Sequence, residues 1–261
     1  MRSGFTLVEL AIVLVIVGLL IGGVLVGQDL IKQAEIKATA AQIERFDTGG
    51  AAFRTKYLAL AGDMSATRAV SYGFTPRAGT RGRGDGNGII ENAGTAIGGL
   101  GGETALYWRD LWQGRMIGLQ YDAATDAIVD SSAWVAPATE EMTLYMPEAR
   151  IRPNDFFHIY GSNGVTYYHL GRFSSGAADG TISWQNGLSP FESYGIDAKL
   201  DDGIPESGLV RAVTDQGVLD TGTAAGPTVC VNTTPTTPEY NVGTDAYRAA
   251  INCQLRIRAQ F

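Results

Sequence analysis

The stretch Phe5-Thr-Leu-Val-Glu-Leu-Ala-Ile-Val-Leu-Val-Ile-Val-Gly-Leu-Leu-Ile-Gly-Gly-Val-Leu-Val26 decides how this chain is organised. Of its 22 residues, only Thr6 and Glu9 carry polar side chains. As a helix, at about 1.5 Å per residue, it is roughly 33 Å long, enough to cross the hydrocarbon core of a bilayer. A carboxylate inside a membrane segment is costly, so we expect Glu9 to have a partner. A cut between Gly4 and Phe5 would place a free α-amino group beside it.

The order Gly4-Phe-Thr-Leu-Val-Glu9, followed at once by the apolar run, resembles the prepilin leader of type IV pilins and pseudopilins. The resemblance covers residues 4–26. It implies that a prepilin peptidase removes residues 1–4 by cutting after Gly4, and methylates the new amine of Phe5. It also implies that Glu9 pairs with the Phe5 amine of a neighbouring subunit during assembly. An ordinary secretory signal or a plain membrane anchor is the alternative, but a signal peptide is cleaved after its apolar region.

The length and charge of the chain limit the kind of body that the apolar segment carries. We expect a leader (1–4), a transmembrane and assembly helix (5–27), the amphipathic half of the same helix (28–62) and an exported globular body (63–261). The length of 261 residues fits one large domain or two small ones. The net charge is −7, and an acidic body has no electrostatic reason to bind nucleic acid.

The first helix is predicted to continue beyond the membrane segment without a break. Between Leu30 and Phe46 the apolar residues recur at helical spacing, and charged residues fill the remaining positions. Gly49 and Gly50 are expected to kink or loosen this helix, and Gly62 and Asp63 to end it. The resemblance implies the same architecture: an α+β fold in which one long N-terminal helix packs on an antiparallel sheet.

The body alternates between helical and extended patterns. A helix is predicted at 102–117, with an aromatic face formed by Tyr107, Trp108 and Trp112; such a face either packs on a sheet or serves as a sugar-binding platform. His158 and His169 fall on facing strands, but no third ligand is spaced to join them, so they are expected to be sheet residues rather than metal ligands. The other predicted elements are strands at 144–146, 155–160, 165–170, 181–185 and 253–261, with a hairpin loop at 161–164, and a helix at 188–200.

Two acidic loops are candidate calcium sites. The first contains Asp85, Asn87 and Glu91 on a glycine-rich turn, an incomplete match to a calcium loop. The second contains Asp197, Asp201 and Asp202 next to Gly203, and is loosely similar to the calcium-stabilised loops of some pseudopilins. Glycine, aspartate and asparagine are also the residues that any tight turn needs, so both interpretations stay open.

The two cysteines, Cys230 and Cys253, both lie near the C-terminus. In an exported body they should pair, whereas in a reducing compartment they would remain free thiols. A disulfide here closes a loop of about 24 residues and contributes roughly 3 kcal/mol in the chain-entropy description. The arrangement resembles the disulfide-bounded C-terminal region of type IV pilins.

The sequence contains none of the common catalytic motifs, such as Gly-x-Ser-x-Gly, a phosphate-binding loop with lysine or His-Glu-x-x-His. This absence is weak evidence by itself, because a glycosidase could use dispersed carboxylates. The resemblance to pilins implies that the protein is structural and not an enzyme. It is inserted once in the inner membrane and then assembled with further copies of itself into a cell-surface type IV pilus-like filament. Its implied partners are the prepilin peptidase and the pilus or type II secretion machinery.

Three alternatives share the leader. A minor pilin and a periplasmic type II secretion pseudopilin belong to the same class; the cysteine pair favours a pilus, and the acidic loops favour a pseudopilin. A membrane-anchored enzyme or carbohydrate-binding module belongs to a different class. Exposed tryptophans or carboxylates gathered in one cleft would favour that class, whereas buried tryptophans would not.

Overall fold

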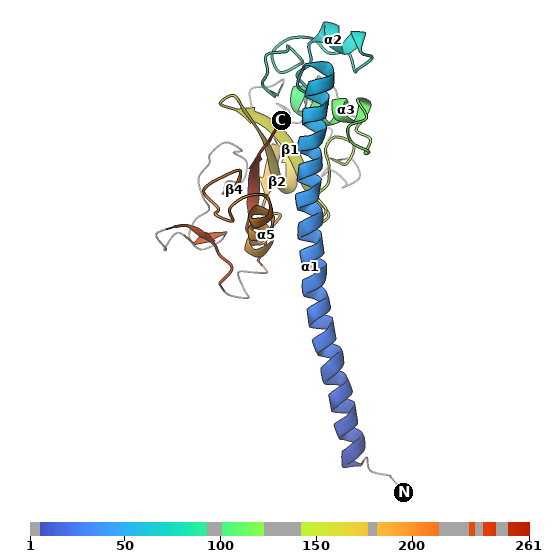
Figure 1. Ribbon diagram of the computed structural model, residues 1–261, viewed down its shortest axis with the longest axis vertical. Helices are drawn as coiled ribbons and strands as arrows, with labels where there is room; N and C mark the ends of the chain where they lie inside the picture. Colours follow the sequence, from blue (N-terminus) through green and yellow to red (C-terminus); the bar gives the residue numbers. More distant parts are fainter. Residues whose placement is uncertain are drawn as a thin grey trace.

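The computed structural model describes residues 6–92, 101–122, 142–176, 182–213, 230–232, 237–243 and 250–261. The predicted cleavage position between Gly4 and Phe5 lies outside the described residues, as does Trp134. In Figure 1 the molecule consists of one long helix and a body that packs on the C-terminal half of that helix.

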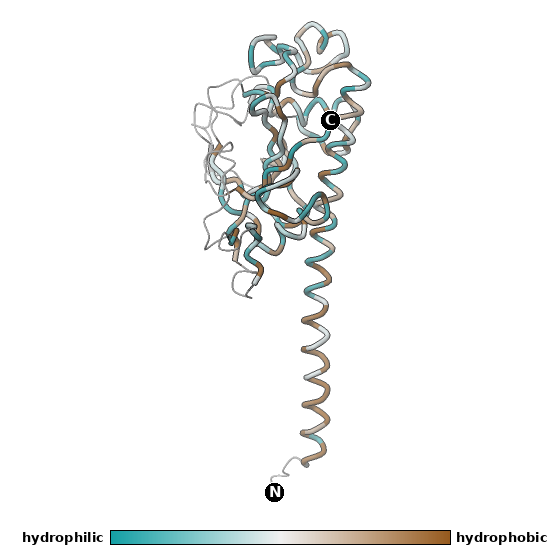
Figure 2. Tube along the Cα trace, turned by 60° about the vertical axis from the view of Figure 1, so that its left-hand side comes forward, coloured by the Kyte–Doolittle hydropathy of each residue, from teal (hydrophilic) through white to brown (hydrophobic). Residues whose placement is uncertain are grey.

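Helix α1 runs without interruption over Leu7–Tyr57, 51 residues in all. Thr6 caps the first turn of the helix. The helix ends because Leu58 adopts a left-handed conformation with φ of 50°. The helix therefore ends before Gly62 and Asp63, where the sequence predicted its end. Its buried side chains begin at Ile36. The helix is apolar up to Gly27 apart from its first residues, and Figure 2 shows this apolar stretch extending away from the body.

The predicted kink at Gly49-Gly50 is wrong, because both glycines lie inside the continuous helix and are buried. They serve close packing instead. A Cβ at Gly50 would lie 2.5 Å from Cδ1 of Phe261, whose ring crosses the helix at this point. A Cβ at Gly49 would meet Met116 and Ile117 at ordinary van der Waals distances of 3.5–3.6 Å.

The two glycines should respond oppositely to the same substitution. Gly49→Ala has room for its methyl group and should raise the free energy of unfolding by up to about 1 kcal/mol, through helix propensity. Gly50→Ala displaces Phe261, and overpacking of this kind lowers stability by about 1–3 kcal/mol. Chemical unfolding of the two variants measures both changes. A gain of stability in both variants would show that the Phe261 ring can pack on the helix without a glycine at position 50.

The strands are β1 Asp155–Ser162, β2 Val165–Gly176, β3 Ile182–Gln185, β4 Val210–Val213, β5 Val231–Asn232, β6 Glu239–Tyr240 and β7 Gln254–Arg258. The main sheet is antiparallel and has the strand order β1-β2-β7-β4, with β3 paired to the far end of β2. A separate two-stranded sheet, β5-β6, lies near the disulfide. The hairpin between β1 and β2 turns on Asn163 and Gly164 alone, both at positive φ, so the predicted four-residue loop shortens to two.

Three further helices complete the described elements: α2 Ala66–Ser71, α3 Gly102–Gln113 and α5 Pro190–Leu200. Helix α3 ends before the predicted residue 117, and Ser189 caps α5 through a reciprocal pair of hydrogen bonds with Glu192. The strand predicted at 144–146 is wrong. These residues form a turn in which the N–H groups of Tyr145 and Met146 donate to the carbonyl of Met142.

The core lies between α1, α3 and the sheet. Trp108 of α3 meets Phe46 of α1 edge-on, with ring centroids 4.9 Å apart, and Tyr168 of β2 lies beside both rings. Trp108 and Trp184 are completely buried or nearly so, and Trp112 is partly buried. The aromatic face of α3 therefore packs against α1 and the sheet, as one of the two readings of the sequence expected, and Trp108 offers no surface to a sugar.

The predicted disulfide between Cys230 and Cys253 is present, with a Cα–Cα distance of 5.2 Å. Cys253 directly precedes β7, and its N–H donates to the carbonyl of Leu188. The bridge therefore ties the β5-β6 hairpin to the main sheet and to the start of α5.

Candidate functional site

The main candidate site is the N-terminal half of α1. Its large apolar side chains face outward all round the helix and are not covered by the described part of the body; Leu7 is 86% exposed and Leu19 is 72% exposed. The segment is long and apolar enough to cross a membrane. Exposed apolar area on this scale is unstable in water and requires lipid or the same face of other helices.

Glu9 lies at the free end of this apolar segment. Its Oε2 accepts hydrogen bonds from the N–H and the hydroxyl of Thr6, each at 2.9 Å, and the Glu9 N–H donates to Thr6 Oγ1 at 3.3 Å. This capping box places the carboxylate at the helix N-terminus, where the helix dipole favours a negative charge. Among the described residues, no basic side chain pairs with Glu9, so its charge is available to an amine.

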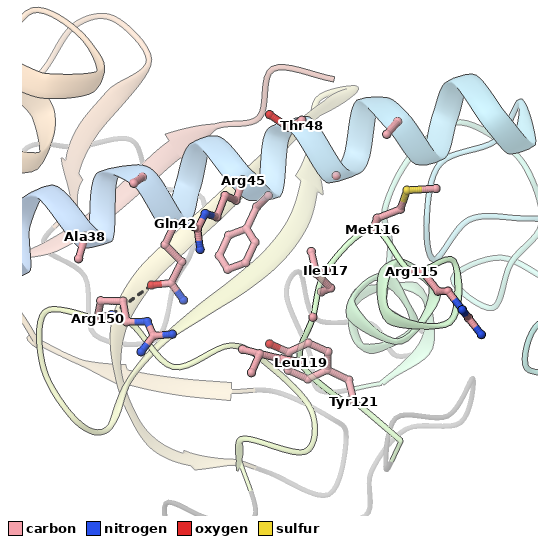
Figure 3. A pocket seen from close by; sticks show the side chains of 15 residues that line it. Ala38, Gln42, Arg45, Thr48, Arg115, Met116, Ile117, Leu119, Tyr121 and Arg150 are labelled. Atoms are coloured by element: carbon pink, nitrogen blue, oxygen red, sulfur yellow. Dashed lines mark hydrogen bonds between the residues drawn. The ribbon is translucent and has the colours of Figure 1, made fainter.

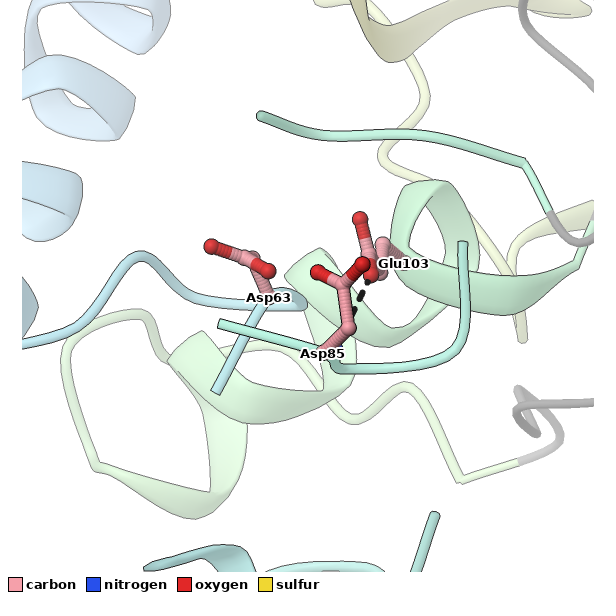
Figure 4. A group of neighbouring side chains, drawn as sticks. All are labelled: Asp63, Asp85 and Glu103. Atoms are coloured by element: carbon pink, nitrogen blue, oxygen red, sulfur yellow. Dashed lines mark hydrogen bonds between the residues drawn. The ribbon is translucent and has the colours of Figure 1, made fainter. Parts of the chain in front are cut away.

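The first acidic loop brings Asp85 to residues that the sequence did not single out. Figure 4 shows Asp85 beside Asp63 and Glu103, and one oxygen of each lies within 4.8 Å of the others. Of the predicted partners, Asn87 bridges Asp85 and Glu91 with its side-chain amide, while Glu91 forms an ion pair with Arg81 at 2.9 Å.

Asp63 and Glu103 anchor this loop through its backbone. Asp63 accepts the N–H groups of Gly86, Asn87 and Gly88, and Glu103 accepts those of Gly84 and Glu91, at 2.7–3.1 Å. Gly84, Gly86 and Gly88 all have positive φ, which lets successive N–H groups turn inward. A calcium loop directs oxygens to its centre, so this loop has the opposite polarity.

Burial changes the acidity of both anchors. It raises the pKa of Glu103 to about 8 and that of Asp63 to about 6, with the nearby Asp85 charge adding to both shifts. The sequence did not predict that Asp63 and Glu103 lie together, because they are 40 positions apart in the chain. The only local signals were the expected helix end at Asp63 and a carboxylate in the first turn of α3.

The raised pKa of Glu103 predicts a pH dependence of stability. The stabilising protonated form is fully present below the unfolded pKa of 4.5 and is lost as the pH rises through about 8. Between these two pKa values the folded chain holds one proton more than the unfolded chain, so the free energy of unfolding falls by up to about 1.4 kcal/mol per pH unit. Glu103→Gln should make the fall in stability between pH 5 and 8 less steep, as measured by chemical unfolding, while Asp63 and Asp197 still contribute to it. A profile as steep as that of the unchanged chain would contradict the role of Glu103.

The second acidic loop is already hydrogen-bonded by its own surroundings. Asp197 accepts the N–H of Gly203 at 3.0 Å and the hydroxyl of Tyr240 at 2.8 Å, and burial raises its pKa to about 7. Asp202 is exposed, and its hydrogen bond from Ser207 lowers its pKa. Asp201 accepts the N–H of Leu209. All three carboxylates converge within 4.8 Å, so the sequence correctly grouped them.

The two histidines face each other across β1 and β2, as predicted, and are buried in the sheet. His169 Nε2 is 2.9 Å from Gln254 Oε1, and burial lowers the pKa of His169 to about 3. Within the described ranges, no group of three metal-ligating side chains includes either histidine. Their place is in the packing against Trp184.

A long apolar helix with an acidic residue at its free end, packed on an antiparallel sheet, defines a type IV pilin-like or pseudopilin layout. The comparison with protein families agrees: the prokaryotic N-terminal methylation motif matches residues 1–25. The chain thus carries a prepilin-type leader, which implies processing by a prepilin peptidase and assembly by pilus-type machinery. The motif is typical of structural, pilin-type proteins. No curated protein and no solved structure matched the chain.

Proposed function

We propose that this protein is the structural subunit of a type IV pilus-like filament. Its helix holds it in the inner membrane, a peptidase processes it after Gly4, and it then assembles with copies of itself. The observation that carries the proposal is the division of α1 into two halves. The half from Ile36 onward is built into the body, while the apolar half before it is uncovered by the described residues.

The same helix can serve both before assembly, in the membrane, and after assembly, in the filament. In the membrane, lipid covers the exposed apolar side chains. In a filament, the same side chains of neighbouring subunits cover one another, while Glu9 meets the Phe5 amine of a neighbour. A misplaced subunit would leave a charge unpaired in an apolar core, so this pairing sets the register of assembly.

The disulfide supports a body that lies outside the cytoplasm, because such bonds persist in oxidising compartments. We therefore place the assembled filament at the cell surface. A type II secretion pseudopilin, which would remain in the periplasm, or a minor pilin is the second candidate; the two acidic glycine loops favour the pseudopilin. For an exported carbohydrate-binding module, the burial of Trp108 and Trp184 removes the most direct sugar-stacking surface.

Intact mass and N-terminal sequencing of protein sheared from the cell surface test the proposal. The expected chain begins at methylated Phe5 and is two hydrogens lighter than the reduced form, because it contains one disulfide. Material found in the periplasm after the same processing would favour the pseudopilin. A chain that begins at Met1 and is found only in membranes would contradict assembly altogether.

Calcium binding remains a proposal, and we assign it to Asp197, Asp201 and Asp202 rather than to the first loop. Asp202 is exposed and ionised, so a cation can reach it, whereas Asp63 and Glu103 are buried under N–H donors. Extracellular calcium sites bind at about 10⁻⁴–10⁻³ M. Calcium at ten times its Kd should raise the free energy of unfolding by about 1.4 kcal/mol. Asp202→Asn should remove this gain, and equal melting temperatures in calcium and in EDTA would contradict it.

A further inference from the structure

A groove lies between α1 and the loop at 115–121 that follows α3, with a volume of about 850 Å³ (Figure 3). Its apolar lining includes Phe46, Met116, Ile117 and Leu119. Ala38, Ala41 and Ala52 on α1 are exposed along one side, so small side chains keep the groove open there.

The charged side chains that line the groove are all basic. They are Arg45 from α1, Arg115 from the end of α3 and Arg150 from the segment before β1. Within the described residues, none of these three guanidinium groups forms an ion pair. The chain as a whole carries a net charge of −7, so this groove is a basic site on an acidic protein. Its chemistry fits an acidic segment that also presents an apolar or aromatic side chain.

The loop that follows α5 has the complementary chemistry. Asp202 and Glu206 are both exposed there. Tyr194 is 44% exposed and lies beside this loop, since its ring would be 3.1 Å from a Cβ at Gly203. An acidic loop and an exposed aromatic ring are therefore presented together.

The groove and this loop lie on opposite faces of α1. Helix α5 packs on α1 at Ile36, where a Cβ at Gly195 would touch the isoleucine side chain. Ile36 and Arg45 are nine positions apart, or two and a half helical turns, which puts them on opposite sides and about 14 Å apart along the axis. Figure 1 agrees: α5 lies on one side of α1, and the loop after α3 lies on the other.

We propose that the groove of one subunit receives the loop at 201–206, with Tyr194, of a second copy of this chain. The contact is heterologous, because two different patches of the same chain meet, and such contacts repeat without closing when the subunits are stepped along an axis. With parallel subunits stepped along the helix axis, one copy's loop comes to the level of its neighbour's groove. The inference rests on the proposed filament, and names the surface by which the bodies of its subunits join.

Charge reversal tests the contact in the full chain. Arg45→Glu places a like charge opposite Glu206, and should reduce filaments sheared from cells by about tenfold or more. Arg54→Glu is the matched control: it is an equally exposed arginine on α1, nine residues further on, on the face away from the groove. Adding Glu206→Arg to Arg45→Glu should restore much of the filament yield. A normal yield from Arg45→Glu, or a failure of Glu206→Arg to restore it, would overturn the proposal.

Crosslinking separates this interface from the filament itself. Two tagged chains, one with Ala41→Cys in the groove and one with Glu206→Cys, are expressed together and treated with a flexible bismaleimide. We expect a mixed dimer, and no dimer from Ala41→Cys alone. A mixed dimer in cells that form no filaments would support the interface and contradict the proposed function. Filaments that give no mixed dimer would support the proposed function and overturn the interface. A dimer formed by the Ala41→Cys chain alone would show that the contact is isologous, which would also overturn the proposed interface.

Discussion

Replacing Glu9 with alanine is expected to leave the protein in the membrane but to reduce its assembled form by roughly a hundredfold, because the amine of its neighbour is then left without a partner. Glu9 is the acidic side chain at the free end of an otherwise apolar helix half, and its described contacts are all with Thr6. Insertion depends on the apolar length, which the substitution increases.

Quantitative immunoblotting of sheared and membrane fractions measures this effect. Glu9→Asp is the control that keeps the charge but shortens the side chain. The amount of assembled protein from this variant should lie between the amounts from the alanine variant and from the unchanged chain. Thr6→Ala removes the hydroxyl of the capping box and leaves the carboxylate, so its effect should be small. Normal filaments from the alanine variant would show that assembly does not need the charge, and the proposed mechanism would be wrong.

Replacing Asp110 with alanine should destabilise the body by about 3–5 kcal/mol, because it leaves a buried guanidinium without its partner. Asp110 Oδ1 is 2.8 Å from Arg77 Nη2, and both side chains are fully buried. Asp110 also accepts the N–H of Gly62 at 2.7 Å, and Arg77 donates to the Gly62 carbonyl at 3.1 Å. One ion pair therefore joins α3, the segment after α1 and the loop before Gly84.

Chemical unfolding in detergent measures the loss of stability. Arg81→Ala is the matched control, because it breaks an ion pair of similar length, to Glu91, whose arginine is 84% exposed; such pairs contribute little. The double variant Arg77→Met with Asp110→Ala should recover part of the loss, since no buried charge remains. Equal effects of Asp110→Ala and Arg81→Ala would contradict the burial argument.

The sequence alone determined the parts of this protein that depend on local pattern. An apolar run with one acid near its start is recognisable without a structure, since membrane insertion depends on composition and length. The long first helix and the β1-β2 hairpin follow from periodicity and turn residues, which act over a few positions. The pairing of Cys230 and Cys253 was inferred because the membrane segment implies an exported body, and because the chain has only these two cysteines.

Tertiary structure decided every feature that depends on residues far apart in the chain. The sequence suggested that Gly49 and Gly50 kink or loosen the helix, whereas Phe261 and Met116 pack into the space they leave. It grouped Asp85 with its near neighbours, whereas Asp63 and Glu103 approach it through the fold.

The groove at Arg45 has the same origin, since its three arginines come from separate segments. Local propensity can be evaluated within a few residues. Close packing and electrostatic grouping exist only after distant segments meet, and for that reason the sequence pattern contains no direct signal of them.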